Sequence, residues 1–166
     1  NDVLPFKDHL IIRGREHGLP QLWIIDVHKK LDIWNNIKFS EEVYDVYTKN
    51  NADYNTSKLR YVYTSAITPS QTIDYNLKNG NKEILKEQHV PGYDMSQYEC
   101  RRVFATGRDG VQIPMTIVAK KDIIPLKATI KHDKPNKCLL IGYGSYGMSY
   151  DVVFNFKQLS LLDRGF

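Results

Sequence analysis

Residues 138–151, with the sequence CLLIGYGSYGMSYD, concentrate residue types that can do chemistry. Gly142, Gly144 and Gly147 fit the G-x-G-x-x-G spacing with which a chain approaches the pyrophosphate of a dinucleotide. Ser145, placed among these glycines, also suggests the nucleophile of a hydrolase. The segment therefore raises two chemical interpretations, phosphate binding and acyl transfer.

Phosphate binding requires a helix that begins inside the glycine run, because the helix amides and the helix dipole hold the pyrophosphate. The glycines are followed by MSYDVVF (148–154), whose aromatic and β-branched residues start helices poorly. A helical pattern begins only near Asn155, and a phosphate would meet the acidic Asp151 first. The sequence therefore disfavours a dinucleotide site.

A nucleophile elbow has the sequence G-x-S-x-G at a strand-to-helix turn. Tyr143 occupies the position two residues before Ser145 where the elbow has glycine, and no helical pattern follows directly. No G-x-S-x-G occurs anywhere in the 166 residues. Ser145 is thus predicted to be a turn residue, in a tight loop that leaves a core strand and is covered by its own tyrosines.

Composition restricts the partners of the chain. Its formal net charge is +4, but the dense basic run at 120–137 is interrupted by prolines and aspartates, which favours a solvated loop over a nucleic-acid site. No apolar run approaches the roughly 18 residues of a membrane-spanning helix. We therefore expect neither a nucleic-acid partner nor a membrane partner.

The metal-binding and redox-active residue types are sparse. Cys100 and Cys138 lie far apart, and the five histidines lack ligand spacing. We expect two buried free thiols in a reducing, cytoplasmic compartment, and neither a metal nor another cofactor.

Two hairpin patterns repeat along the first half of the chain. The strands HLIIR and QLWIIDV, joined by the turn-rich residues 14–20, are followed by LRYVYTS and QTIDYNL, and Leu10 and Leu59 mark a period of about 50 residues. Such a period is typical of four-stranded β-propeller blades. With further strands at NIKFS, EVYDVYT and NKEILKE, residues 32–88 are expected to form one blade and part of the next.

The pattern changes between Gln88 and Glu99. The alternating runs YECRRVFATG and VQIPMTIVAK surround an Asp-Gly turn and predict a hairpin. A strand is expected at 138–144, and Phe156, Leu159, Leu162 and Phe166 fall at helical spacing before a stop at Arg164 and Gly165. The order strand, strand, strand, helix is typical of the start of an α/β domain.

Several motifs occur together in an order that resembles one family. LIGYGSYGMSYDVVF followed by LSLLDRGF, together with GLPQLWIID, EEVYDVYT and GYDMSQYECRRVFATGRDGVQIPMTIV, is similar to the oligopeptidase B branch of the prolyl oligopeptidase family of serine peptidases. The resemblance implies the C-terminal blades of a seven-bladed β-propeller at 1–90, a linker at 91–98, and the first strands and helix of an α/β-hydrolase domain at 99–166. We expect a fragment that is truncated before the nucleophile.

The resemblance also implies an activity. Members hydrolyse short peptides, in this branch after Arg or Lys, with a Ser-His-Asp triad and no cofactor. The triad segments are expected downstream of this chain, so the chain alone is expected to be inactive and to need the remainder of its parent chain. The alternative is a non-catalytic β-propeller binding module with a vestigial hydrolase-like tail.

Three residues carry family roles by position. Tyr143 corresponds to a tyrosine whose hydroxyl donates to the oxyanion. Tyr146 corresponds to an aromatic residue that lines the S1 pocket, although a ring packed in a core is an equal alternative. Asp151 corresponds to the first of two acidic positions that bind a basic P2 residue of the substrate. Val153 occupies the second, which leaves the P2 preference open.

Overall fold

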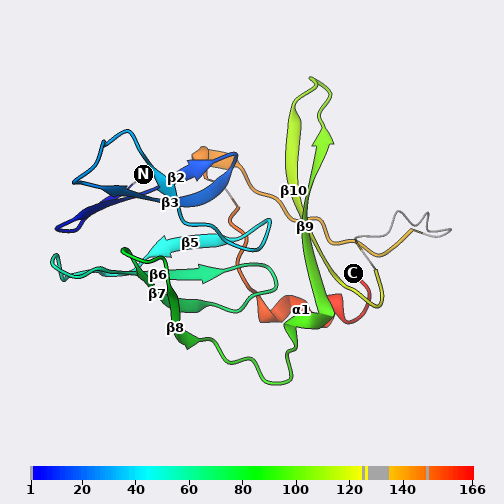
Figure 1. Cartoon of the computed structure of the whole chain (residues 1–166). Helices are drawn as coiled ribbons and strands as arrows, with labels where there is room; N and C mark the ends of the chain where they lie inside the picture. Colours follow the sequence, from blue (N-terminus) through cyan, green and yellow to red (C-terminus); the bar gives the residue numbers. More distant parts are fainter. Residues whose placement is uncertain (1, 125, 127–134, 149) are drawn as a thin grey trace.

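The computed structural model describes residues 2–124, 126, 135–148 and 150–166. These residues form two four-stranded antiparallel sheets, a two-stranded ribbon, two short 3-10 turns and one α-helix (Figure 1). The first sheet contains β1 (Asp2–Pro5), β2 (His9–Glu16), β3 (Leu19–Asp26) and β4 (Asn35–Asn36) in that order. The second contains β5 (Asp45–Thr48), β6 (Lys58–Thr64), β7 (Gln71–Asn76) and β8 (Lys82–Glu87).

The hairpin of the first sheet is tighter than its sequence predicted. Strands β2 and β3 pair over their whole length, up to Glu16 and Leu19, so only His17 and Gly18 form the turn. Both turn residues have positive φ, 51° and 79°, which is the backbone of a two-residue turn that matches the twist of the strands. The prediction of a loop at residues 14–20 was wrong. His17 adopts the left-handed backbone conformation, which allows a two-residue turn and longer strands.

The boundary between the two sheets also differs from the prediction. Asn36 lies in β4 and pairs with β3, and the amide of Ile37 donates to the carbonyl of Leu22 at 2.9 Å. The side chain of Asn36 adds a 2.7 Å hydrogen bond to Gln21. The start of the NIKFS segment therefore completes the first sheet through β4, and the second sheet comprises residues 45–87 rather than a unit that starts near 32.

One apolar core joins the two sheets. Its buried members come from both: Phe6, Ile11, Leu22, Ile24, Ile37, Tyr44, Val46, Leu59, Tyr61, Tyr63, Ile73 and Leu77. Strand β6 is central, with Leu59 and Tyr61 fully buried. The ring of Phe39 stacks on Tyr63 at 5.2 Å and contacts Tyr44 at 4.6 Å, so aromatic packing closes the space between the sheets.

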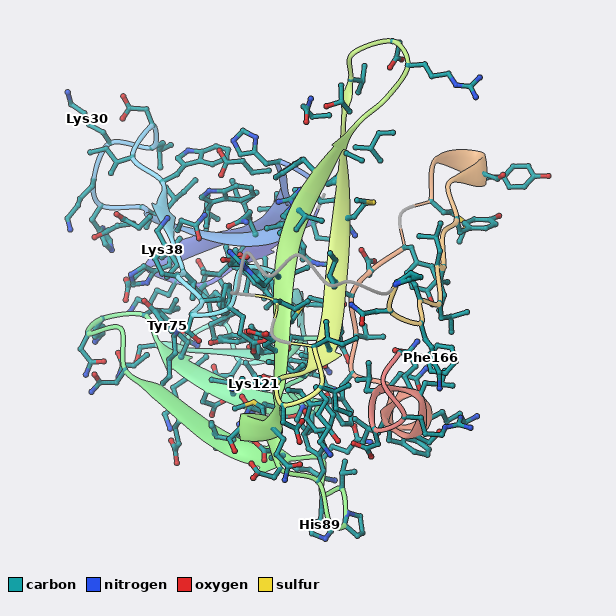
Figure 2. All side chains as sticks on the ribbon, turned by 90° about the vertical axis from the view of Figure 1, so that its right-hand side faces the viewer. Lys30, Lys38, Tyr75, His89, Lys121 and Phe166 are labelled. Atoms are coloured by element: carbon teal, nitrogen blue, oxygen red, sulfur yellow. The ribbon has the colours of Figure 1, made fainter. Side chains whose placement is uncertain are left out.

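The ribbon follows the second sheet and confirms the predicted hairpin. Strands β9 (Tyr98–Thr106) and β10 (Gln112–Lys120) pair without interruption, and Gly110 supplies the positive φ of the turn. The 3-10 turn η1 (Met95–Gln97) precedes β9. The far end of the ribbon extends beyond the other elements (Figures 1 and 2).

Helix α1 (Phe156–Leu162) begins where the sequence predicted. The side chain of Asn155 caps it by accepting a hydrogen bond from the amide of Lys157 at 3.1 Å. Gly165 has a φ of 82°, as expected of a residue that stops a helix.

The strand expected at 138–144 does not form. Its apolar side chains face solvent, with Leu140 84% exposed, and Cys138 is exposed rather than buried. A strand forms only against a neighbour that accepts its backbone hydrogen bonds, and no described strand lies in register with this segment. Residues 99–166, expected to begin an α/β-hydrolase domain, thus contain the ribbon and one helix among the described residues, and most of the predicted basic loop at 120–137 lies outside those residues.

We predict that Leu59→Ala lowers the free energy of unfolding by about 2–5 kcal/mol, because it removes a fully buried side chain from the shared core. Chemical denaturation, with hydrogen exchange of the β6 amides, measures the change. Ile84→Ala, at a side chain 55% exposed on β8, is the control and should change stability by less than about 0.5 kcal/mol. Equal effects of the two substitutions would contradict the assigned core.

Candidate functional site

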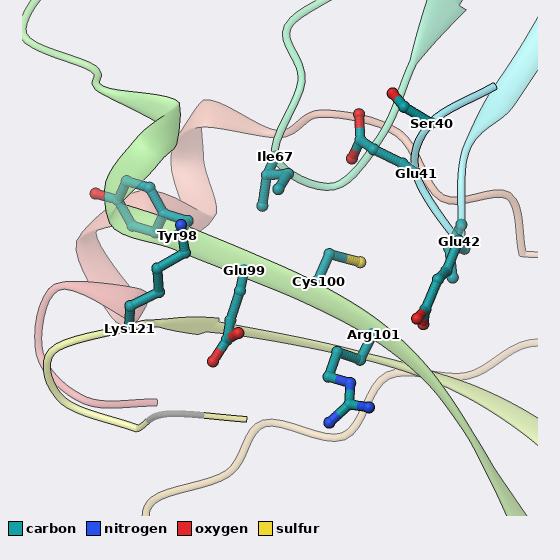
Figure 3. Close-up of a pocket in the computed structure, with 10 residues that line it drawn as sticks. Ser40, Glu41, Glu42, Ile67, Tyr98, Glu99, Cys100, Arg101 and Lys121 are labelled. Atoms are coloured by element: carbon teal, nitrogen blue, oxygen red, sulfur yellow. The ribbon is translucent and has the colours of Figure 1, made fainter. Parts of the chain in front are cut away.

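A cleft of about 390 Å³ lies where the loop before β5 meets the start of β9 (Figure 3). One wall is the loop 40–43, which connects the two four-stranded sheets, and the other is the first half of β9 together with Lys121, which follows β10. The lining residues are Ser40, Glu41, Glu42, Val43, Ile67, Tyr98, Glu99, Cys100, Arg101 and Lys121. The cleft therefore marks the junction between the second sheet and the ribbon.

Glu41 is the acceptor of a hydroxyl cluster at this junction. Its carboxylate accepts hydrogen bonds from Tyr63 at 2.9 Å, from Ser65 at 2.5 Å and from Thr68 at 2.5 Å. The hydroxyl oxygen of Ser65 in turn accepts the amides of Ile67 and Thr68 at 3.1 and 2.9 Å. One carboxylate thus holds the turn between β6 and β7 in place.

Cys100 faces the same cleft and is a poor nucleophile there. Burial, followed by the negative charges of Glu41 and Glu42, raises the pKa of its thiol to about 12. The thiol stays protonated near neutral pH, and a thiol reacts only as the thiolate. Cys100 is a free thiol, as the sequence predicted, but it is half-buried rather than buried.

Aromatic and charged contacts join the ribbon to the segment before β9 and to the end of α1. The rings of Tyr93 and Tyr98 stack at 5.3 Å, and Phe154 meets Tyr93 edge-on at 5.0 Å. The Tyr98 hydroxyl donates to Asp163 at 2.8 Å, and Lys120 pairs with the same carboxylate at 3.0 Å. These two bonds, that from Tyr98 first, hold the pKa of Asp163 below its usual range.

The structure places Tyr143 and Tyr146 on an exposed loop. Tyr143 is 52% exposed, and Tyr146 is 94% exposed with a φ of 56° inside the 3-10 turn η2 (Ser145–Gly147). The ring of Tyr146 therefore does not pack in a core formed by the described residues. In the same part of the chain the first α-helix after the glycines begins at Phe156, too late to hold a phosphate in the glycine loop.

Asp151 has a partner that the sequence did not reveal. Its Oδ1 accepts a hydrogen bond from Nη2 of Arg15 on β2 at 2.5 Å. Behind the pair lies Asp45, only 8% exposed, whose pKa is raised by burial and then by the charge of Asp151. The alternation of Arg13 and Arg15 along β2 shows that they share one face, but nothing in the sequence connects that face to Asp151.

Asp151 bonds to the first sheet, whereas the side chains of Tyr143 and Tyr146 are exposed to solvent. The side chains of the three predicted site residues therefore do not form one cluster. Among the described residues, no group of histidine, cysteine and carboxylate side chains has the arrangement of a metal site. Within residues 2–124, 126, 135–148 and 150–166, no helix is long and apolar enough to cross a bilayer.

Comparison with known proteins shows the family. The sequence matches the family described as prolyl oligopeptidase, N-terminal beta-propeller domain, over residues 1–88. Protease 2 of Moraxella lacunata is 35% identical over 165 residues, which cover 99% of this chain and 22% of that protein. Dipeptidyl aminopeptidase BI of Pseudoxanthomonas mexicana is 38% identical over 96% of this chain and 21% of its own length.

Solved structures agree with this assignment. Oligopeptidase B from Trypanosoma brucei, in a closed form with covalently bound antipain, superposes with a TM-score of 0.82 at 29% identity over 99% of this chain and 23% of that one. Oligopeptidase B from Leishmania major gives 0.83 at 27% identity. The two four-stranded sheets are thus part of a β-propeller.

The chain belongs to the prolyl oligopeptidase family, whose members are serine peptidases. It carries part of the N-terminal propeller domain of that family at residues 1–88. The chain spans about a fifth of the length of the curated relatives it matches.

We predict that Glu41→Ala speeds hydrogen exchange at the amides of Ile67 and Thr68 and lowers stability by about 1.5–3 kcal/mol, because three hydroxyls lose a charged acceptor. Exchange measured by mass spectrometry or NMR tests this. Glu42→Ala is the matched control, because Glu42 accepts only the amide of Arg102, at 3.1 Å, among the hydrogen bonds of the described residues. Unchanged exchange at Ile67 and Thr68 in Glu41→Ala would refute the role of Glu41.

Proposed function

We propose that this chain is part of a serine oligopeptidase of the oligopeptidase B type, which hydrolyses short peptides after Arg or Lys. The observation that carries the proposal is the similarity to two oligopeptidase B structures over 99% of the chain, including the residues beyond the propeller match. In this proposal residues 1–90 are the last propeller blades, 91–98 are a linker, and 99–166 begin the catalytic domain.

The catalytic serine, histidine and aspartate would lie in a part of the protein outside this chain. What the chain contributes is supporting chemistry. Tyr143 would donate its hydroxyl to the oxyanion, for which its exposed position on a glycine-rich loop is suitable. Tyr146, whose ring is free of the core, would line the S1 pocket, and Asp151 would pair with a basic P2 residue.

The activity itself is tested on the full-length protein with fluorogenic peptides that carry Arg, Lys or Ala at P1, together with a fluorophosphonate that labels reactive serines. Hydrolysis after Arg and Lys, with labelling, is the expected result. A protein that neither cleaves nor labels would instead support a non-catalytic propeller module that binds its partners without reaction.

We predict that Tyr143→Phe in the full-length protein lowers kcat by about 100- to 1000-fold, which is the usual effect of losing one oxyanion donor, while KM changes little. Steady-state kinetics on an Arg-P1 peptide measure both constants. Tyr150→Phe, at a neighbouring tyrosine that is 58% exposed, is the control and should retain the wild-type kcat. A wild-type kcat in Tyr143→Phe would remove Tyr143 from the oxyanion site.

We predict that Asp151→Asn lowers the ratio of kcat/KM for an Arg-P2 peptide to kcat/KM for an Ala-P2 peptide by about 1.5- to 5-fold, the effect of one partly exposed ion pair. The same two peptides, with Arg at P1, measure the ratio in the wild type. Asp32→Asn removes an exposed carboxylate elsewhere and is the control. An equal loss on both peptides would contradict a P2 role.

A further inference from the structure

The carboxylate proposed to bind substrate already holds an arginine of this chain. Nη2 of Arg15 lies 2.5 Å from Oδ1 of Asp151, while Nη1 donates to the carbonyl oxygen of Gly18 at 3.3 Å. The side chains of Arg15 and Asp151 keep 37% and 38% of their surface exposed. The pair is therefore directly bonded but open to solvent, so a competing cation can approach it.

The surrounding charges favour a cation at this place. Asp45 is buried, and its Oδ1 has no hydrogen-bond partner among the described residues. Burial, and after it the negative charge of Asp151, raises the pKa of the Asp45 carboxyl, while the charges of Arg13 and Arg15 act in the opposite direction. Without a guanidinium nearby, the two carboxylates would repel each other across a partly dehydrated surface.

Arg13 also lies close enough to act on Asp45, but the bonds of its guanidinium in the described part of the chain do not include one to Asp151. It lies on the same face of β2, but its guanidinium contacts the carbonyl of Val46 at 3.4 Å and the carboxylate of Asp2 at 3.5 Å. Arg15 is thus the guanidinium bonded to Asp151 among the described residues. This difference makes Arg13 a natural control for Arg15.

We propose that Arg15 is a specificity-determining residue that competes with the substrate: it occupies Asp151 in the free protein, and a basic P2 residue binds by displacing it. This inference rests on the proposed function, because it takes Asp151 as the P2 carboxylate. The bond to Arg15 matches chemically what a substrate arginine would form, a charge-assisted hydrogen bond to Oδ1. The competition multiplies the affinity for a basic P2 residue by the fraction of molecules in which Asp151 is unoccupied, so a smaller fraction means weaker apparent binding.

The test compares Arg15→Gln with the wild type in the full-length protein, using Arg-P1 peptides with Arg or Ala at P2. The ratio of kcat/KM for Arg-P2 over Ala-P2 is expected to rise by about 1.5- to 5-fold, mainly through a lower KM for the Arg-P2 peptide. Taking the ratio cancels any common effect on folding or on chemistry. Arg13→Gln should leave the ratio unchanged, and Arg15→Lys, which keeps one cationic contact, should give a smaller rise.

A double variant separates this inference from the proposed function. In an Asp151→Asn background, Arg15→Gln should no longer change the ratio. The carboxylate for which Arg15 and the P2 residue compete is then absent. If Asp151→Asn lowers the ratio but Arg15→Gln leaves it unchanged or lowers it, the P2 role of Asp151 stands and the competition is refuted. If Asp151→Asn has no effect on the ratio, both the P2 role and the competition are refuted.

Discussion

The apolar contact between the two four-stranded sheets is the interaction on which the rest of the structure depends. Propeller blades bury one repeat against the next, so neither sheet has a complete core alone. Here the buried residues of β2, β3, β5, β6 and β7 form one cluster, closed by the aromatic rings around Phe39. Because this packing sets the distance between the sheets, it also sets the positions of Arg15 on β2 and of Glu41 before β5.

The polar contacts of the second half are built onto this core. Glu41 orders the turn after β6, and the hydroxyl of Thr64 at the end of β6 accepts the amide of Phe154 at 3.2 Å. Tyr98 and Lys120 meet at Asp163, beyond the helix. The short segment 151–154 is consequently bonded to the first sheet, through Arg15 and Asp151, and to the second sheet, through Thr64 and the amide of Phe154.

The alternation and spacing of residue types predicted the strands and the helix correctly where contacts between residues close in sequence decide the backbone. Alternating runs marked β6 and the ribbon, and Asn155 with the spacing of Phe156 and Leu159 marked the start of α1. The prediction was wrong at 138–144, because an apolar run becomes a strand only beside another strand. It was also wrong at His17, a non-glycine residue that adopts a left-handed backbone in a two-residue turn.

The sequence by itself predicted most strands of the two sheets, the hairpin of β9 and β10 and the start of α1, and it disfavoured a phosphate site at the glycines. Its motifs, taken together in their order, indicated the family. The strands and the helix follow from residue types at short, regular spacing, which bias the local backbone and are readable without a fold. Only the tertiary structure decided that Arg15 bonds to Asp151, 136 residues away, and that Glu41 collects three hydroxyls. Such pairs form because packing brings distant strands and loops together, and no local propensity encodes which charge will meet which.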